Sequence, residues 1–240
     1  MGVFRFKKFE VINERSAMKV NTDGVLLGAA MTIRPSDNSY LDVGTGTGTI
    51  ALMAAQRAES DCMIDAIDID DVSVEEAAAN FKRSPWASCL NARHSSLEDF
   101  SAALPAEKRY DLIFSNPPYF ESSLLAPEQR RSNARHTSTG LSYRELLEFA
   151  QQRLSEEGRI SMVLPAEQEM ALCRHARMCG LYLFRIVRVR TVPRKAPVRM
   201  IAEFRRQRCE EPEEVLLTIQ KEGKYTDEYL SLTRDFYLFA

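Results

Sequence analysis

A short proline-rich turn at residues 116–119 follows the apolar run 110–115. Pro117 and Pro118 fix the backbone and supply no N–H groups, so nearby carbonyls are free to point at a ligand. The side-chain oxygen of Asn116 and the carbonyl of Pro117 can accept hydrogen bonds from one amino group, and Tyr119 can stack on a planar ring. Such acceptors would direct the nitrogen lone pair toward a methyl group. The alternative interpretation is a rigid turn that only ends a strand.

A glycine-rich loop that begins at Asp42 is the second candidate site. Gly44, Gly46 and Gly48 let the chain turn sharply, and the helix that follows offers free N–H groups. Asp68 lies 20 residues beyond Gly48, at the end of the next predicted strand, where an acid can accept hydrogen bonds from ribose hydroxyls. Together these residues predict a site for an adenosine-type ligand. A tight turn beside a solvated acid is the alternative.

The charge beside this loop discriminates between ligands. Dinucleotide sites usually read G-x-G-x-x-G, whereas the spacing here is G-x-G-x-G and Asp42 precedes it. A carboxylate repels a pyrophosphate but suits a cation, such as the ammonium or sulfonium of S-adenosylmethionine. The sequence therefore favours S-adenosylmethionine over a nicotinamide cofactor.

Alternating apolar strands and amphipathic helices from residue 39 onward predict an α/β fold with a parallel sheet covered on both faces. Strands are expected at 40–43, 63–68, 90–94, 110–115 and 159–164, with helices at 49–57, 72–82, 142–154 and 168–178. Three further extended stretches, at 182–192, 200–207 and 215–220, have no long helix between them. Consecutive strands with short links predict antiparallel pairing at one edge of the sheet.

The chain of 240 residues is expected to form one domain. We divide it into an N-terminal extension (1–35), a core (36–207) and a C-terminal strand and tail (208–240). The longest apolar run, at 25–33, is about half of what a membrane-spanning helix needs. Five scattered cysteines without a CxxC pair and three dispersed histidines predict no disulfide framework and no metal. These features predict a cytoplasmic protein, and a monomer is favoured.

The motifs resemble those of the class I S-adenosylmethionine-dependent methyltransferases, whose (N/D)PP(Y/F) motif occurs in enzymes that methylate planar nitrogens. Over residues 18–28, MKVNTDGVLLG is similar to the KvgTDgvLLGaw signature of the bacterial tRNA(Val) adenine-37 N6-methyltransferases. Segments 4–9 and 225–237 also resemble that family. Two positions depart from it, because Asn21 replaces a frequent glycine and Ser96 a frequent adenine-binding aspartate. Thr22 and Asp23 also suit the start of a helix before an apolar run.

This resemblance implies a Rossmann-like class I methyltransferase fold with a seven-stranded, mostly parallel sheet, an antiparallel edge hairpin and helices on both faces. It implies S-adenosylmethionine as cofactor and tRNA as partner, methylated on N6 of adenine-37. The catalytic turn would be Asn116, Pro117, Pro118 and Tyr119. The candidate cofactor-binding residues are Lys19, Thr22, Asp23, Asp42, Gly44, Gly46, Gly48, Asp68, Ile69 and Ser96.

A local excess of basic residues supports a nucleic-acid partner, although the net charge of the chain is -2. Residues 185–208 contain nine basic side chains and one acid, Glu203. Arg194 and Lys195 fall at a proline-flanked hairpin tip, from which they could reach phosphates. The candidate RNA-binding residues are Arg130, Arg131, Arg135, Arg188, Arg190, Arg194, Lys195 and Arg199. Edge strands also use basic residues to prevent aggregation, which is the alternative.

Other functions remain open from sequence. The same turn occurs in enzymes that methylate rRNA guanine N2, DNA adenine N6 or protein glutamine. The glutamine enzymes usually carry a helical N-terminal domain, for which residues 1–35 are too few, and the DNA enzymes add a target-recognition domain. A nicotinamide oxidoreductase and a non-catalytic RNA-binding protein are the alternatives from other classes.

Overall fold

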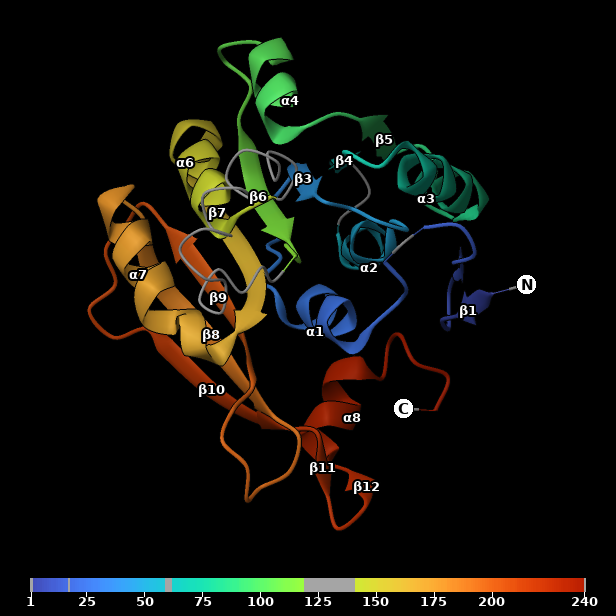
Figure 1. The fold of residues 1–240 in the computed structure, drawn as a ribbon, viewed down its shortest axis with the longest axis vertical. Coiled ribbons are helices and arrows are strands. Elements are labelled where there is room, and N and C mark those ends of the chain that lie inside the picture. Colours follow the sequence, from blue (N-terminus) through green and yellow to red (C-terminus); the bar gives the residue numbers. More distant parts are fainter. Residues whose placement is uncertain (1, 17, 59–61, 119–140, 240) are drawn as a thin grey trace, which may run out of the picture.

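An eight-stranded sheet forms the centre of the computed structural model, which describes residues 2–16, 18–58, 62–118 and 141–239 (Figure 1). Its strand order is β5-β4-β3-β6-β7-β9-β8-β10. The strands are β3 (Ser39–Val43), β4 (Met63–Asp68), β5 (Leu90–His94), β6 (Tyr110–Ser115), β7 (Leu154–Pro165), β8 (Tyr182–Arg190), β9 (Arg199–Arg205) and β10 (Glu213–Thr218).

The sheet is parallel from β5 to β7, and β9 pairs antiparallel with both β7 and β8. The predicted α/β class and the antiparallel β8–β9 pair are confirmed, but the expected count of seven strands is one too few. The hairpin also lies inside the sheet, because β10 pairs parallel with β8 and forms the edge. Ion pairs Arg185–Glu213 (3.2 Å) and Arg188–Glu214 (2.8 Å) hold β10 there.

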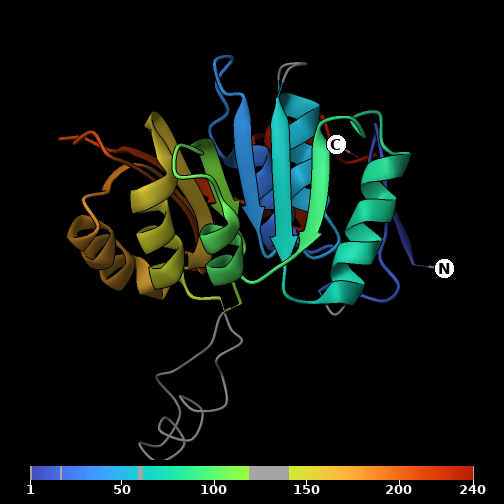
Figure 2. The same cartoon turned by 90° about the horizontal axis from the view of Figure 1, so that it is seen from above.

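Helices cover both faces of the sheet (Figures 1 and 2). One face packs against α1 (Thr22–Ala30), α2 (Thr49–Arg57), α3 (Asp71–Arg83) and α8 (Asp227–Thr233). The other packs against α4 (Leu97–Ala103), α6 (Tyr143–Arg153) and α7 (Glu169–Met178), the last preceded by the short 3-10 helix η1 (Ala166–Gln168). Successive side chains of β6 point to opposite faces of the sheet. Leu112 and Phe114 pack in the layer with α1, α2, α3 and α8, and Ile113 packs in the layer with α4, α6 and α7.

Helix α1 begins at Thr22, as expected from sequence, but its N-cap lies one residue before the Thr22-Asp23 pair. Asn21 is the N-cap, and its side-chain oxygen accepts a hydrogen bond from the N–H of Gly24 (2.9 Å). The asparagine at this position therefore satisfies an N–H group that a glycine would leave to solvent.

Helix α1 packs closely against α2 because Gly28 has no side chain. A Cβ atom at Gly28 would lie 2.7 Å from Sδ and 2.9 Å from Cβ of Met53. Arg57, at the end of α2, donates to the carbonyls of Gly28 (2.7 Å) and Met31 (2.8 Å). These contacts satisfy carbonyls at the end of α1 and fix α1 against the helix that follows the glycine loop.

The two ends of the described chain lie against each other. The N-terminal segment forms a hairpin of β1 (Val3–Arg5) and β2 (Glu10–Ile12), and β11 (Gln220–Lys221) pairs with β12 (Lys224–Tyr225). The N–H of Lys7 donates to the carbonyl of Phe236 (2.8 Å), and the rings of Phe6 and Tyr237 stack with centroids 6.1 Å apart. Within the described ranges, no helix is long and apolar enough to cross a membrane.

Candidate functional site

The carboxyl ends of the parallel strands lie along one edge of the sheet, where their arrowheads point in Figure 2. Strand pairing places Asp42 beside Phe114, so the glycine loop after β3 lies next to the turn after β6. The buried hydroxyl of Ser115 donates to the carbonyl of Val43 (2.7 Å) and ties the two strand ends together. This edge is where open α/β sheets bind ligands.

The glycine loop has a backbone that only glycine adopts readily. Gly44, Gly46 and Gly48 have φ angles of 74°, 54° and 79°. At Gly48, the N-cap of α2, a Cβ atom would also lie 2.4 Å from the ring of Phe81. The three glycines therefore set the course of the loop, and the absence of a side chain at Gly48 lets α2 begin close to Phe81 of α3, while Gly44 is exposed.

Asp68 anchors this loop from the end of β4. Its Oδ2 accepts the N–H of Gly46 (2.8 Å), and its Oδ1 accepts the N–H of Asp70 (3.0 Å). A carboxylate can accept about four hydrogen bonds, so this half-buried group can also receive ligand hydroxyls. Two large apolar side chains, Ile69 and Met18, are each 50% exposed near the loop, and a Cβ atom at Gly46 would lie 3.8 Å from Cβ of Met18.

Asp42 lies beneath the loop and is completely buried. Its Oδ2 accepts a hydrogen bond from the hydroxyl of Thr45 (2.7 Å), while its Oδ1 has no hydrogen-bond partner among the described residues. Burial raises the pKa of Asp42 to about 7, and the hydrogen bond from Thr45 opposes that rise. The negative charge of Asp68 adds to it.

The remaining candidate cofactor residues divide between the start of α1 and the start of α4. Lys19 donates from Nζ to the carbonyls of Asn13 (3.0 Å) and Glu14 (2.9 Å). Thr22, the first residue of α1, is exposed, and Asp23 in the same turn accepts from Nε of Arg199 (2.8 Å). The structure thus pairs a candidate cofactor residue, Asp23, with a candidate RNA-binding residue, Arg199.

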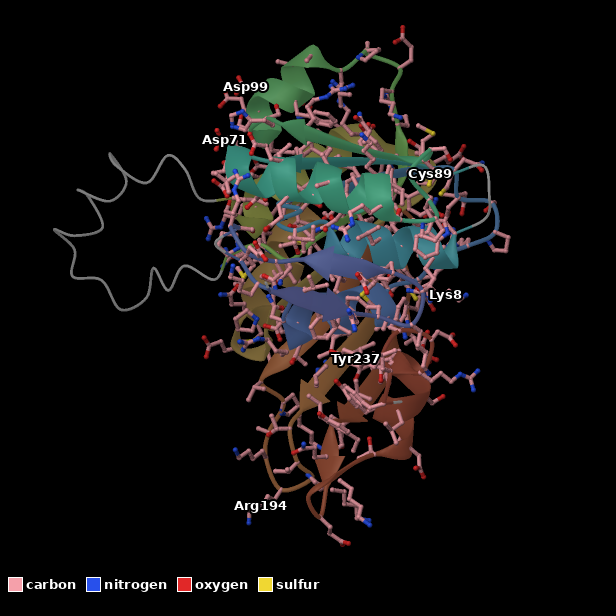
Figure 3. The ribbon with its side chains drawn as sticks, turned by 90° about the vertical axis from the view of Figure 1, so that its right-hand side faces the viewer. Lys8, Asp71, Cys89, Asp99, Arg194 and Tyr237 are labelled. Atoms are coloured by element: carbon pink, nitrogen blue, oxygen red, sulfur yellow. The ribbon has the colours of Figure 1, made fainter. Side chains whose placement is uncertain are left out.

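Ser96 caps α4 and brings an acid with it that the sequence prediction did not include. Its hydroxyl accepts the N–H of Asp99 (3.0 Å) and donates to the carboxylate of that residue (2.6 Å). Figure 3 shows Asp99 on the same side of the molecule as Asp71, which starts α3. The Ser-x-x-Asp spacing typical of a helix start could have indicated Asp99.

The catalytic turn predicted from sequence continues directly from β6. Asn116 is half-buried, Pro117 is buried and Pro118 is exposed, while Tyr119 lies outside the described residues. The tie between Ser115 and Val43 therefore also fixes the residue that precedes Asn116.

The candidate RNA-binding residues differ in the contacts that their side chains make. Arg188 bonds to Glu169 (2.6 Å) and Glu214 (2.8 Å), and these hydrogen bonds raise its pKa. Arg190 donates to the hydroxyl of Thr218 (2.8 Å) and to the carbonyl of Pro193 (2.9 Å). These two arginines, like Arg199, therefore make contacts within the protein.

Two candidates, Arg194 and Lys195, are exposed in the connection between β8 and β9. Figure 3 shows Arg194 at the end of the molecule far from Asp99. Within the part of the chain that the structure describes, neither side chain forms an ion pair. Three further candidates, Arg130, Arg131 and Arg135, lie outside the described residues.

Sequence reasoning missed the polar residues of α3 that hold the loop. Asn80, only 1% exposed, donates from Nδ2 to the carbonyls of Thr47 (2.9 Å) and Ile12 (3.0 Å). A polar residue on the packed stripe of an amphipathic helix was the available signal. No group of three or more His, Cys, Asp or Glu side chains among the described residues could hold a metal ion.

Comparison with known proteins gives concordant matches. Residues 16–176 match the methyltransferase small domain family. A "tRNA1(Val) (adenine(37)-N6)-methyltransferase" from Parabacteroides distasonis is 43% identical over 98% of this chain and 97% of its own length. One of the same name from Mannheimia succiniciproducens is 38% identical, covering 98% and 94%.

Solved structures match the fold. A predicted O-methyltransferase from Agrobacterium tumefaciens aligns with a TM-score of 0.63 at 15% identity, over 89% of this chain and 96% of its own. A methyltransferase from Pyrococcus furiosus aligns with a TM-score of 0.60 at 18% identity, over 82% and 89%.

Proposed function

Because the chain belongs to the methyltransferase small domain family and, over nearly its whole length, to that of the tRNA1(Val) (adenine(37)-N6)-methyltransferases, we propose that it methylates N6 of adenine-37 in this tRNA with S-adenosylmethionine. The observation that carries the proposal is the adjacency of the turn at Asn116 to the glycine loop, with Ser115 bonded to Val43. We further propose that the enzyme acts in the cytoplasm as a monomer.

The residues at this edge fit an adenosylated cofactor. The exposed Gly44 leaves the backbone of the loop open to a ligand, and Asp68 retains acceptor capacity for ribose hydroxyls. Met18 and Ile69 supply apolar surface for a purine ring. When bound, S-adenosylmethionine supplies a methyl group on a sulfonium, which is already activated for transfer.

The turn at Asn116 would hold and orient the acceptor amine. Its side-chain oxygen and the carbonyl of Pro117 would each accept one hydrogen of the adenine N6 group, which frees the nitrogen lone pair. Pro117 and Pro118 restrict the backbone, so little orientational freedom is lost on binding. Alignment of the adenine nitrogen with the methyl group is the main requirement for catalysis, and no general base is needed. The nitrogen becomes strongly acidic on methylation and can release its proton to water.

The acceptor base must leave its stack to reach this turn. That costs a few kcal/mol in a duplex and less in a loop, so a loop of tRNA suits the site. Arg194 and Lys195, exposed in the β8–β9 connection, are suited to bind phosphates of the same molecule.

The proposal is tested by transfer of tritium from labelled S-adenosylmethionine to tRNA that lacks the modification, followed by nucleoside analysis. We expect N6-methyladenosine at position 37, and we expect Asn116→Ala to reduce transfer by roughly 100-fold or more while S-adenosylhomocysteine still binds. Asn38→Ala, at an exposed position before β3, is the matched control and should retain activity. Label in guanine, or transfer only to protein or DNA, would contradict the assignment.

A further inference from the structure

Helix α3 carries a polar stripe that is buried. Ser73, Glu76 and Asn80 are 3%, 6% and 1% exposed and fall on one helix face by their spacing. The residues that cover them belong to the end of β2 and to the chain that leads from it toward α1. We call residues 12–16, 18 and 19 the N-terminal strap. The strap continues from a hairpin that lies beside α3 in two views (Figures 1 and 3).

Glu76 binds the strap through consecutive backbone groups. Its Oε1 accepts the N–H groups of Glu14 (2.8 Å) and Arg15 (3.0 Å), and its Oε2 accepts the N–H of Ser16 (3.0 Å). Burial alone would raise the pKa of Glu76, but these hydrogen bonds outweigh it, so the pKa lies below its ordinary value. At neutral pH, one carboxylate therefore holds the backbone of the strap.

The same helix face connects the strap to the candidate cofactor site. The hydroxyls of Ser16 and Ser73 are 2.8 Å apart, and Ser73 donates in turn to Asp70 (2.5 Å). The N–H of Asp70 bonds to Asp68, which also binds the glycine loop. Asn80 bonds to both Ile12 and Thr47, one residue in the strap and one in the loop.

The strap itself passes beside the loop. Cβ of Met18 would contact a side chain at Gly46, and the next residue, Lys19, bonds back to two carbonyls of the strap. A displaced strap would remove the apolar surface of Met18 from the loop. It would also release Lys19, which leads directly into α1.

We propose that Glu76 is a positioning residue that holds the N-terminal strap against the glycine loop and so sets the affinity for S-adenosylmethionine without touching it. This inference rests on the proposed function. Ser73 and Asn80 share the task, and the larger part falls to Glu76 because it alone bonds to three strap N–H groups.

The test is Glu76→Gln, which keeps the side-chain volume but turns one acceptor into a donor that faces an N–H group. We expect the Kd for S-adenosylhomocysteine and the KM for S-adenosylmethionine to rise about tenfold, with kcat on tRNA within about twofold of wild type. Glu107→Gln is the matched control, because it makes the same change at an exposed position between α4 and β6, outside both α3 and the strap. That variant should leave both constants unchanged.

Ser73→Ala keeps Glu76 intact and should raise KM by about two- to threefold, which covers the case in which Glu76→Gln folds poorly. Unchanged Kd and KM in the well-folded variants would overturn the proposal, as would a fall in kcat with KM unchanged. Binding of S-adenosylhomocysteine is measured without tRNA. A wild-type protein that binds it but does not methylate tRNA would therefore contradict the proposed substrate and leave the strap test intact.

Discussion

Among the residues of the site, Asp42 has the most unusual surroundings. It is fully buried, and one of its oxygens has no hydrogen-bond partner among the described residues. A buried carboxylate with one free oxygen is costly, and its raised pKa of about 7 reflects that cost. Its hydrogen bond with Thr45 nevertheless shapes the start of the glycine loop.

Stability should therefore depend on pH through Asp42. Its pKa is about 7 in the folded protein against an ordinary 3.8, so between these values the folded state holds a proton that the unfolded state has lost. The free energy of unfolding should fall as pH rises through this window, by several kcal/mol in all, and then level off. Asp42→Asn removes the titration, so its stability relative to wild type should grow up to about pH 7 and then stay constant.

Urea unfolding of both proteins at intervals from pH 4 to pH 8 measures this difference. Thr45→Val is a useful companion, because it removes the hydrogen bond to Asp42 while leaving the titrating group. A stability difference between Asp42→Asn and wild type that is the same at every pH would contradict the expectation.

Single residues were predictable where their chemistry is local. The glycine loop and the position of Asp68 follow from the order of a strand, a turn and a helix, and the structure brings them together. The Asp23–Arg199 ion pair could not be predicted, because it joins residues on α1 and β9 that are distant in sequence. The network around Glu76 was missed for the same reason.

At the level of elements, the packing of α1 on α2 determines where the start of α1 lies. Both glycines of α1 face α2, but they differ in the space around them. A Cβ atom at Gly24 would make ordinary contacts at 3.6 Å with Ile50, whereas one at Gly28 would overlap Met53.

We expect Gly28→Ala to destabilise the protein by about 1–3 kcal/mol, because the backbone of α2 must move to admit the methyl group. Gly24→Ala is the control on the same helix, and it should be neutral or stabilising by up to about 1 kcal/mol owing to its better helix propensity. Chemical denaturation of the two variants measures both values. Equal losses of stability would show that helix contact is not what distinguishes the two positions.

Elements with a strong periodic pattern were predicted from sequence. Helix α2 spans the expected residues, and α3, α6 and α7 differ from expectation by a residue or two at their ends. Helices α4 and α8 are short, and α1 is buried nearly all round, so none of them has a clear amphipathic pattern. The position of β10 could not be predicted from periodicity, because β10 pairs with β8 rather than with β9, the strand that precedes it in the chain.

For the whole molecule, the distribution of charge matters more than its sum. Exposed Arg194 and Lys195 lie together on the β8–β9 connection, whereas several other basic residues nearby are neutralised by acids. The net charge of -2 therefore gives no measure of how this end of the protein meets a polyanion.

Reversing both charges, Arg194→Glu with Lys195→Glu, should weaken tRNA binding. The slope of the logarithm of the binding constant against the logarithm of salt concentration should become shallower, by roughly one for each phosphate that the variant no longer binds. Filter binding across a range of salt concentrations measures both effects. Lys82→Glu with Arg83→Glu, at the exposed end of α3, is the matched control. Unchanged tRNA affinity in a folded Arg194/Lys195 variant would exclude this connection from the RNA-binding surface.

The contact between the two ends of the chain has a consequence for biosynthesis. Lys7 bonds to Arg234 across a separation of 227 residues, and the ring of Phe6 stacks on Tyr237. During translation the hairpin leaves the ribosome well before residues 234–237, so it gains these partners late. The strap that continues from this hairpin therefore gains the last of its support only after residues 234–237 have emerged, so a nascent chain should retain the cofactor less well before that point.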